Sequence, residues 1–331
     1  MTSLYPLKFI PILKERVWGG NRLSGEYGKK AGKKGKIGES WELSGVQGDI
    51  SEVANGFLAG NSLEEIIEVY MGDLVGEKIY DKFGREFPLL IKLIDANEDL
   101  SIQVHPPDDI ARERHHAYGK TEMWYILEAD DKAKIYTGFN QEMTKERYVK
   151  SLEGGDIAQI LNIEKPQPGD VFFIPAGRIH AIGKGVMLTE IQQTSDITYR
   201  IWDWKRNGLD GKPRELHTEL AVDAIDYNTY ESYKTRVDPE LNGTVNIIDC
   251  KYFTTNIIEL DQTIIKDYSL IDSFVIYICI QGNAKLEWDD KSINLEKGET
   301  VLIPALMETI RIQPVPSARI LEVYIRKIIE E

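Results

Sequence analysis

Short apolar or alternating runs, rich in β-branched and aromatic residues, recur along the chain and are bounded by Gly, Pro, Asp or Asn. Runs of this length and composition predict β-strands. Because the strands are short and separated by turn residues, they predict antiparallel sheets rolled into a barrel or sandwich. The runs are residues 7–11, 40–43, 89–93, 100–104, 122–127, 133–137, 170–174, 186–192 and 198–202.

Helical periodicity appears in three insertions between these strands, at residues 62–71, 144–152 and 215–225. The first opens with Ser62 followed by Glu65, the spacing of a capping box. None of the three carries a glycine-rich phosphate loop. We therefore expect short helices that pack over the ends of the β-structure.

A stretch near the C-terminus repeats an earlier one. Residues 165–176 resemble residues 294–305, so that Gly169 and Pro175 become Gly298 and Pro304 at a constant offset of 129 residues. The strands upstream align at a different offset, which places Val275 opposite Glu122. The simplest interpretation is a duplicated barrel in which the second copy, residues 231–331, has no metal-binding side chains.

Composition narrows the classes of function. The chain has 331 residues, 42% of them apolar, and a net charge of −14. Such a charge is not that of a surface for nucleic acid or anionic membranes, so we expect neither as a partner. An anionic substrate would have to be bound by a few local Lys and Arg side chains. The one basic cluster, residues 29–36, is expected to be a solvated loop.

Cysteine usage and hydropathy favour a cytoplasmic protein. The two cysteines, Cys250 and Cys279, do not form a Cys-x-x-Cys pair, so we expect buried thiols rather than a disulfide. No apolar stretch approaches the roughly 20 residues of a membrane span. The N-terminal residues lack the apolar region of a signal peptide.

Two histidines, a carboxylate and an amide lie on or beside predicted strands. Successive strand residues point to opposite faces, so Gln103 and His105 share a face, as do Lys120 and Glu122. Together with His180, three short strands can aim these side chains at one point inside a barrel. Two imidazoles and a carboxylate form the ligand set of catalytic zinc, which leaves room for a substrate.

The segments around these residues resemble known families. The Gly-Asp pattern of residues 169–180 resembles the cupin superfamily. Residues 101–106, 119–125, 175–181 and 190–200 resemble the zinc and active-site motifs of type I phosphomannose isomerases, in the short bacterial form. The resemblance covers roughly residues 1–230. It implies a mainly β fold of two cupin-type (jelly-roll) barrels, with a catalytic metal-binding barrel at residues 1–230.

Carried over residue by residue, the resemblance implies that one Zn²⁺ is bound by Gln103, His105, Glu122 and His180, and that Arg200 is catalytic. Such enzymes interconvert mannose 6-phosphate and fructose 6-phosphate, which implies a cis-enediol intermediate. Longer members carry a histidine immediately before the lysine of the Lys-x-Glu motif. This chain has Gly119 there, so a proton carried by that histidine must be carried by another group.

The chemistry needs a general base and a phosphate-binding cation. Glu190 is the candidate base, because burial beside other carboxylates would raise its pKa toward the working pH, and Lys120 is the rival. The phosphate can be bound by Lys120, Arg178, Arg200 or Lys205. We expect the protein to be a monomer or a weak homodimer.

Other interpretations of the same residues remain open. Two histidines and a glutamate also form the facial triad of an Fe(II) dioxygenase. A non-catalytic sugar-phosphate-binding cupin is the third hypothesis. The histidines can also be core residues, Gln103 a hydrogen-bonding residue, and Arg200 a structural ion-pair partner of Asp203 or Asp196.

Overall fold

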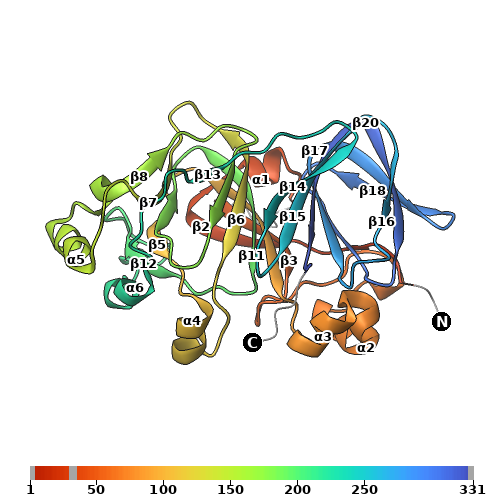
Figure 1. Ribbon diagram of the computed structural model, residues 1–331, viewed down its shortest axis with the longest axis horizontal. Coiled ribbons are helices and arrows are strands. Elements are labelled where there is room, and N and C mark those ends of the chain that lie inside the picture. Colours follow the sequence, from red (N-terminus) through yellow and green to blue (C-terminus); the bar gives the residue numbers. More distant parts are fainter. Residues whose placement is uncertain (1–3, 30–35, 327–331) are drawn as a thin grey trace. The chain divides into compact units, whose positions relative to one another are not determined.

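The protein divides into two compact units, which are described separately. The structure is a computed structural model that describes residues 4–29 and 36–326 (Figure 1). The first unit contains residues 1–12, 42–89 and 236–331, and the second contains residues 13–41 and 90–235. Residues 30–35 of the predicted basic loop lie outside the described residues.

The second unit is built from two sheets. A seven-stranded sheet has the strand order β13-β9-β6-β11-β4-β3-β2, and a five-stranded sheet has the order β12-β5-β10-β7-β8. Pairs such as β11–β6 and β12–β5 run antiparallel. The strands of the larger sheet are β2 (Ile12–Gly20), β3 (Ile37–Ser44), β4 (Leu89–Ala96), β6 (Glu122–Ala129), β9 (Val171–Ile174), β11 (Val186–Gln193) and β13 (Lys234–Thr235). Those of the smaller sheet are β5 (Ile102–Val104), β7 (Ile135–Phe139), β8 (Leu161–Glu164), β10 (His180–Ile182) and β12 (Tyr199–Trp202).

Helices join these strands. The predicted helix at 144–152 is α5 (Lys145–Gly154), and the hydroxyl of its N-cap residue Thr144 accepts a hydrogen bond from the backbone of Arg147. The predicted helix at 215–225 is shorter, because α6 (Thr218–Ala224) begins only after His217. The charged run before Gly119 forms α4 (Asp108–His115). The remaining helices are α1 (Arg22–Gly25) and the 3-10 turn η2 (Ile157–Ile160).

The first unit contains an eight-stranded sheet of order β1-β19-β17-β20-β15-β14, with β16 paired to β20 and β18 to β17. Its strands are β1 (Leu7–Lys8), β14 (Gly243–Asp249), β15 (Thr254–Leu260), β16 (Ile264–Asp267), β17 (Val275–Trp288), β18 (Lys291–Glu296), β19 (Thr300–Ile303) and β20 (Thr309–Tyr324). Its helices are α2 (Leu63–Val75), α3 (Glu77–Phe83) and the 3-10 turn η1 (Gly56–Leu58). The predicted capping box is confirmed, since Ser62 and Glu65 exchange hydrogen bonds at the start of α2.

The predicted internal repeat agrees with the strand registers of the two units. Glu122 on β6 pairs with Ile174 on β9, and Val275 on β17 pairs with Ile303 on β19. The alignment made from the sequence therefore places corresponding residues at corresponding points of two antiparallel ladders. The paired strands form open sheets among the described residues. The mainly β architecture is confirmed, whereas two closed jelly rolls stay a prediction.

The cysteines and the helix lengths bear on two further expectations from the sequence. Cys250 and Cys279 are both free thiols, and Cys279 is buried, as its apolar strand predicted. Cys250 is only partly buried. Within residues 4–29 and 36–326, no helix has the length and apolarity needed to cross a membrane.

A half-buried ion pair joins β2 and β3 in the second unit. The guanidinium of Arg16 donates from Nε and Nη2 to the two carboxylate oxygens of Glu39, at 3.0 and 3.1 Å. The indole of Trp41 donates to the same carboxylate at 2.7 Å. Burial raises the pKa of Glu39, but Lys92 and Arg16 outweigh burial and lower it to about 2. The carboxylate therefore stays ionised in the folded chain.

This pair predicts an acid-sensitive stability. Because the pKa of Glu39 is about 2 in the folded chain against 4.5 ordinarily, its stabilisation is complete above pH 4.5 and is lost as the pH falls toward 2. At neutral pH we expect Glu39→Gln to lower the free energy of unfolding by about 3 kcal/mol, and to flatten its pH dependence between those limits. Urea unfolding at several pH values measures this. Glu15→Gln, which removes an exposed carboxylate from β2, is the control, and parallel curves for Glu39→Gln and the parent would contradict the prediction.

Candidate functional site

Strand register brings three predicted site residues together on the five-stranded sheet. Gln103 on β5 is the direct partner of His180 on β10 and of Arg200 on β12. Residues directly opposite one another in an antiparallel pair point to the same face. Their side chains therefore form one row across the sheet.

A second row crosses the seven-stranded sheet. Glu122 on β6 is the partner of Gln192 on β11, and Trp124 is the partner of Glu190. Because Glu122 and Trp124 are two residues apart on one strand, all four side chains share a face. The site is built from these two rows and from the loop that carries His105.

Three of the four predicted metal ligands converge in the structure. The ligand atoms of His105, Glu122 and His180 lie within 4.8 Å of one another, and all three residues are buried. Nε2 of each imidazole is 3.5 Å from one carboxylate oxygen of Glu122, a different oxygen for each ring. The carboxylate thus lies between the two rings.

Backbone carbonyls fix the orientation of both imidazoles. Nδ1 of His105 lies 2.9 Å from the carbonyl oxygen of Ile197, and Nδ1 of His180 lies 2.8 Å from that of Arg178. A carbonyl only accepts, so each Nδ1 carries the proton and each Nε2 presents a lone pair to Glu122. This is the tautomer that a metal ligand needs.

The pKa shifts keep the rings neutral. Burial and the neighbouring cation Lys120 lower the pKa of His105 well below its ordinary range. Burial also lowers the pKa of His180 to about 4, against the opposing hydrogen bond to Arg178. Burial and the nearby charge of Glu190 raise the pKa of Glu122 to about 7. Two neutral imidazoles therefore surround a carboxyl group that is costly to ionise.

The arrangement fits a divalent metal ion. Both oxygens of Glu122 are buried without a hydrogen-bond partner, which is expensive unless a cation satisfies them. A tetrahedral ion with bonds of about 2.1 Å separates its ligand atoms by roughly 3.4 Å. The two nitrogen–oxygen separations of 3.5 Å, each to a different oxygen of Glu122, are close to that value. Among the described residues, this is the group of His, Cys, Asp or Glu side chains that can hold a metal.

Gln103 and Lys120 border this group. The amide nitrogen of Gln103 lies 3.3 Å from Nε2 of His180, and its oxygen accepts a hydrogen bond from Ser101 at 3.2 Å. The ammonium group of Lys120 lies 3.1 Å from Nε2 of His105 and 3.3 Å from Glu122. The structure thus places Gln103 at the site with its nitrogen, not its oxygen, toward the cluster. Its role as a ligand stays a prediction.

Glu190 is buried beside the cluster with its own partners. Its carboxylate accepts hydrogen bonds from the ammonium of Lys92 at 3.0 Å and from the indole of Trp124 at 2.8 Å. Burial raises the pKa of Glu190, but Lys92 and Lys120 outweigh burial, so that the pKa is lowered. The expectation that burial would raise the pKa of Glu190 is wrong, because the sequence did not show that Lys92 lies beside this carboxylate.

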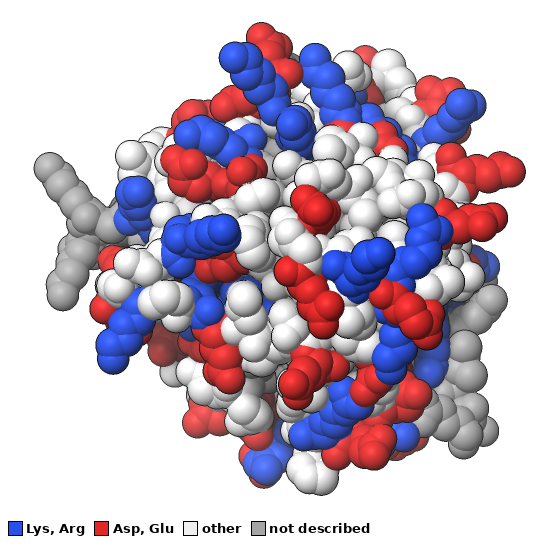
Figure 2. Space-filling view, turned by 90° about the vertical axis from the view of Figure 1, so that its left-hand side faces the viewer, with Lys and Arg blue, Asp and Glu red and all other residues white. Residues whose placement is uncertain are grey.

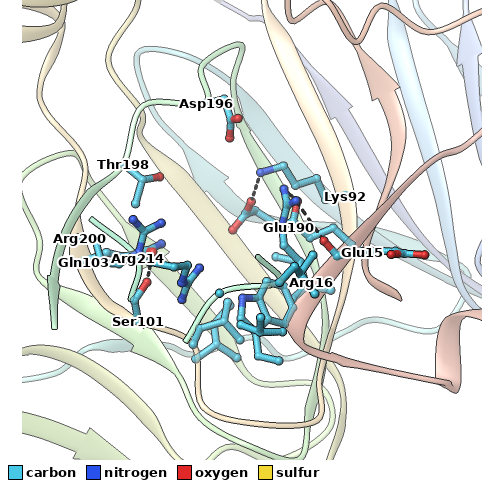
Figure 3. A pocket seen from close by; sticks show the side chains of 18 of the residues that line it. Glu15, Arg16, Lys92, Ser101, Gln103, Glu190, Asp196, Thr198, Arg200 and Arg214 are labelled. Atoms are coloured by element: carbon cyan, nitrogen blue, oxygen red, sulfur yellow. Dashed lines mark hydrogen bonds and ion pairs between the residues drawn. The ribbon is translucent and has the colours of Figure 1, made fainter. Parts of the chain in front are cut away.

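A cavity of about 560 Å³ opens beside the cluster (Figure 3). Its lining includes the predicted residues Gln103, Lys120, Glu190 and Arg200, together with His217. Figure 3 shows Arg200 and Gln103 on one side and Glu190 with Lys92 on the other. A space of this size accommodates a sugar phosphate.

Two of the predicted phosphate-binding residues lie outside this lining. Arg178 donates to the carbonyl of Phe173 at 2.9 Å and stacks its guanidinium over Tyr230 and Tyr233. Lys205 lies over the ring of Trp202. The phosphate role of Arg178 stays a prediction.

Several residues that line the cavity were not predicted from the sequence. Lys92 is buried in β4, and its signal was a single charge within the apolar run 89–94. Arg16 and Glu39 come from strands whose register the sequence does not give. Arg214 lies in a loop without a recognised motif, and its place in the cavity wall follows only from tertiary structure.

The other histidines lie at the end of α4 and at the start of α6. His115 and His116 are exposed at the end of α4, and Nε2 of His115 lies 2.7 Å from the hydroxyl of Tyr199. His217 is the N-cap residue of α6 and reaches the cavity.

Comparison with known families is consistent with this geometry. The model of the type I phosphomannose isomerase catalytic domain matches residues 7–142. The model of the mannose-6-phosphate isomerase cupin domain matches residues 243–325. The second match gives the C-terminal part of the chain a cupin domain, as its strand pattern predicted.

Individual relatives extend over nearly the whole chain. The mannose-6-phosphate isomerase ManA of Bacillus subtilis is 34% identical over 305 residues, which cover 90% of this chain and 93% of the relative. A mannose-6-phosphate isomerase of Streptococcus mutans is 31% identical, over 90% of this chain and 92% of its own. A crystal structure of the mannose 6-phosphate isomerase from Bacillus subtilis superimposes with a TM-score of 0.84 at 32% identity, covering 97% of this chain and 99% of that one. The chain belongs to the type I phosphomannose isomerase family.

Proposed function

We propose that this protein is a zinc-dependent isomerase that interconverts mannose 6-phosphate and fructose 6-phosphate through a cis-enediol. Membership of the family supports an enzyme of this type. The observation that carries the proposal is the buried cluster of His105, Glu122 and His180, with both Nε2 atoms aimed at an unsatisfied carboxylate beside a substrate-sized cavity.

His105, Glu122 and His180 would bind the metal, and Gln103 would complete the set after its amide turns by 180°. When bound, Zn²⁺ supplies a Lewis acid that polarises a carbonyl without redox chemistry. The resident residues do the remaining work. Lys120 lies close enough to His105 to contact a hydroxyl of a sugar bound there.

The isomerisation moves one proton between neighbouring carbons. A base removes the proton on C2 of the open-chain aldose and negative charge develops on O1, a proton then passes from the C2 hydroxyl to O1, and a proton returns to C1 as the C2 carbonyl forms. We assign the base to Glu190, which lines the cavity. Lys92 and Lys120 lower the pKa of Glu190, so its carboxylate stays ionised. Arg200 lies on the same face as Gln103 and would stabilise the developing oxyanion or bind phosphate.

The remaining assignments belong to the same proposal. Residues 1–230 would form the catalytic part and residues 231–331 a cupin-like barrel without metal ligands, each part a jelly roll. The substrate is a small sugar phosphate, and the chain acts in the cytoplasm as a monomer or weak homodimer. The face seen in Figure 2 carries basic and acidic side chains interspersed. We assign the attraction of an anionic sugar to the Lys and Arg side chains that line the cavity.

Metal dependence tests the zinc assignment. Dialysis against a chelator should abolish turnover of mannose 6-phosphate, and Zn²⁺ should restore it. Glu122→Gln should lose bound zinc and lower kcat/KM at least a hundredfold, because the ligand set loses its only anion. Glu128→Gln, on the same strand but partly exposed, is the matched control. Full activity of metal-free protein, or restoration by Fe(II) with oxygen uptake, would overturn the assignment and favour the dioxygenase.

The general base is tested by removing its charge. Glu190→Gln should lower kcat about a hundred- to ten-thousandfold while zinc content stays unchanged, because an amide cannot accept the proton. The rate at which the C2 proton exchanges with deuterated solvent should fall by a similar factor. Asp95→Asn is the matched control, since it removes another buried, ion-paired carboxylate that does not line the cavity. Near-normal exchange in Glu190→Gln would transfer the role to Lys120.

A further inference from the structure

The loop of residues 203–217, here called the arginine loop, joins β12 to α6 and forms part of the cavity wall. Its base is closed by two hydrogen bonds. The backbone N–H of Arg200 donates to Nδ1 of His217 at 3.2 Å, and the N–H of His217 donates to the carbonyl of Arg200 at 2.7 Å. Near its tip, Asn207 and Pro213 form an antiparallel bridge. The loop is therefore a built element of the site.

One carboxylate organises two guanidinium groups within this loop. Arg214 donates from Nε to Asp203 at 2.7 Å and from Nη2 to the other oxygen at 2.5 Å. Arg206 donates from Nε and Nη2 to one oxygen of Asp203, at 3.0 and 2.8 Å. Two positive charges share one negative charge, which leaves the cluster with a net charge of about +1 by this count.

Arg200 adds a third guanidinium. Its Nη1 donates to the backbone carbonyl of Glu215 in the arginine loop at 2.9 Å, and its Nε is buried without an acceptor. Burial and the nearby charge of Arg214 lower the pKa of Arg200. Of the three guanidiniums, those of Arg200 and Arg214 line the cavity, and the unsatisfied buried donor of Arg200 gives them a site that an additional anion would complete.

The opposite side of the cavity has no such excess of positive charge. Arg16 is paired with Glu39, and Lys92 is paired with Glu190. Figure 3 shows Arg16, Lys92 and Glu190 on the side away from Arg200 and Arg214. Asp210 of the arginine loop also lines the cavity, but Arg200, Arg206 and Arg214 outnumber Asp203 and Asp210, so an anionic group entering the cavity is drawn to this side.

We infer that Arg214 binds the phosphoryl group of the substrate together with Arg200, and so makes the site specific for a phosphorylated sugar. The inference rests on the proposed function for the identity of the sugar. Asp203 holds the Nε and Nη2 edge of Arg214, while Nη1 makes no hydrogen bond to the described residues. A guanidinium anchored on one edge presents its remaining N–H groups in a fixed direction, which suits a phosphoryl group.

Arg206 provides the matched control. It is anchored on the same carboxylate and also donates to the carbonyl of Asp99, but it does not line the cavity. Arg206→Gln and Arg214→Gln each remove one charge from the loop and leave Asp203 with one guanidinium partner. A purely structural role of the pair predicts equal effects of the two substitutions.

The test compares these variants by kinetics and by phosphate binding. Arg214→Gln should raise KM for mannose 6-phosphate roughly ten- to a hundredfold, with little change in kcat. It should raise the Kd of inorganic phosphate, measured by calorimetry, by a similar factor. Arg206→Gln should change both by less than threefold. Arg214→Lys should recover part of the affinity for phosphate, and melting temperatures verify that every variant is folded.

The two proposals fail in distinguishable ways. An unchanged phosphate Kd in folded Arg214→Gln, or an equal loss in Arg206→Gln, would overturn the role of Arg214 whatever the enzyme does. If the parent protein does not turn over mannose 6-phosphate but its phosphate binding depends on Arg214, the proposed function fails and the anion site stands. Turnover of unphosphorylated mannose should not respond to Arg214→Gln, and an equal rise in KM for mannose would also overturn the inference.

Discussion

The site of this protein depends on one buried carboxylate whose oxygens receive no hydrogen bond. Burying an ionised carboxylate costs several kcal/mol unless a partner compensates, and the pKa of Glu122, raised to about 7 chiefly by burial, expresses that cost. The nearest imidazole atoms are lone pairs, because the backbone carbonyls of Ile197 and Arg178 hold the protons on the other ring nitrogens. Three electron-pair donors converge and the ammonium group of Lys120 lies beside only two of them, so a metal cation is the partner that satisfies all three.

The sequence was enough to predict which residues form this group, because the alternation of a strand is a local property. Gln103 and Glu122 could each be placed on a face from their neighbours alone. What the alternation does not contain is register. The row from His180 through Gln103 to Arg200 exists because β5 lies between β10 and β12 in the sheet. That order follows from the whole fold, and only the resemblance to a known family indicated it beforehand.

Electrostatics was the part that the sequence could not supply. The pKa of Glu190 was expected to be raised, and Lys92, about a hundred residues away in the chain, lowers it instead. Arg214 shows the same limit, since its loop has no motif and gains its role only when Asp203 and Arg200 come close. Charges separated in sequence interact across strands and loops, and their balance decides which wall of the cavity receives an anion.

The repeated strands show which positions separate a reactive site from a structural one. In the first unit, Glu322 pairs with Tyr277 in the register that Glu190 and Trp124 occupy in the second. Its carboxylate accepts hydrogen bonds from Tyr268 at 2.5 Å and Asn256 at 2.7 Å, and it pairs with Lys266 at 2.9 Å. A buried carboxylate at this point is thus common to both units and is satisfied by protein donors in each. The two units differ two residues before Tyr277 on β17, where Val275 occupies the register that Glu122 occupies on β6. Without a carboxylate at this position and without imidazoles beside it, the first unit needs no cation, and its strands still pair in the same way.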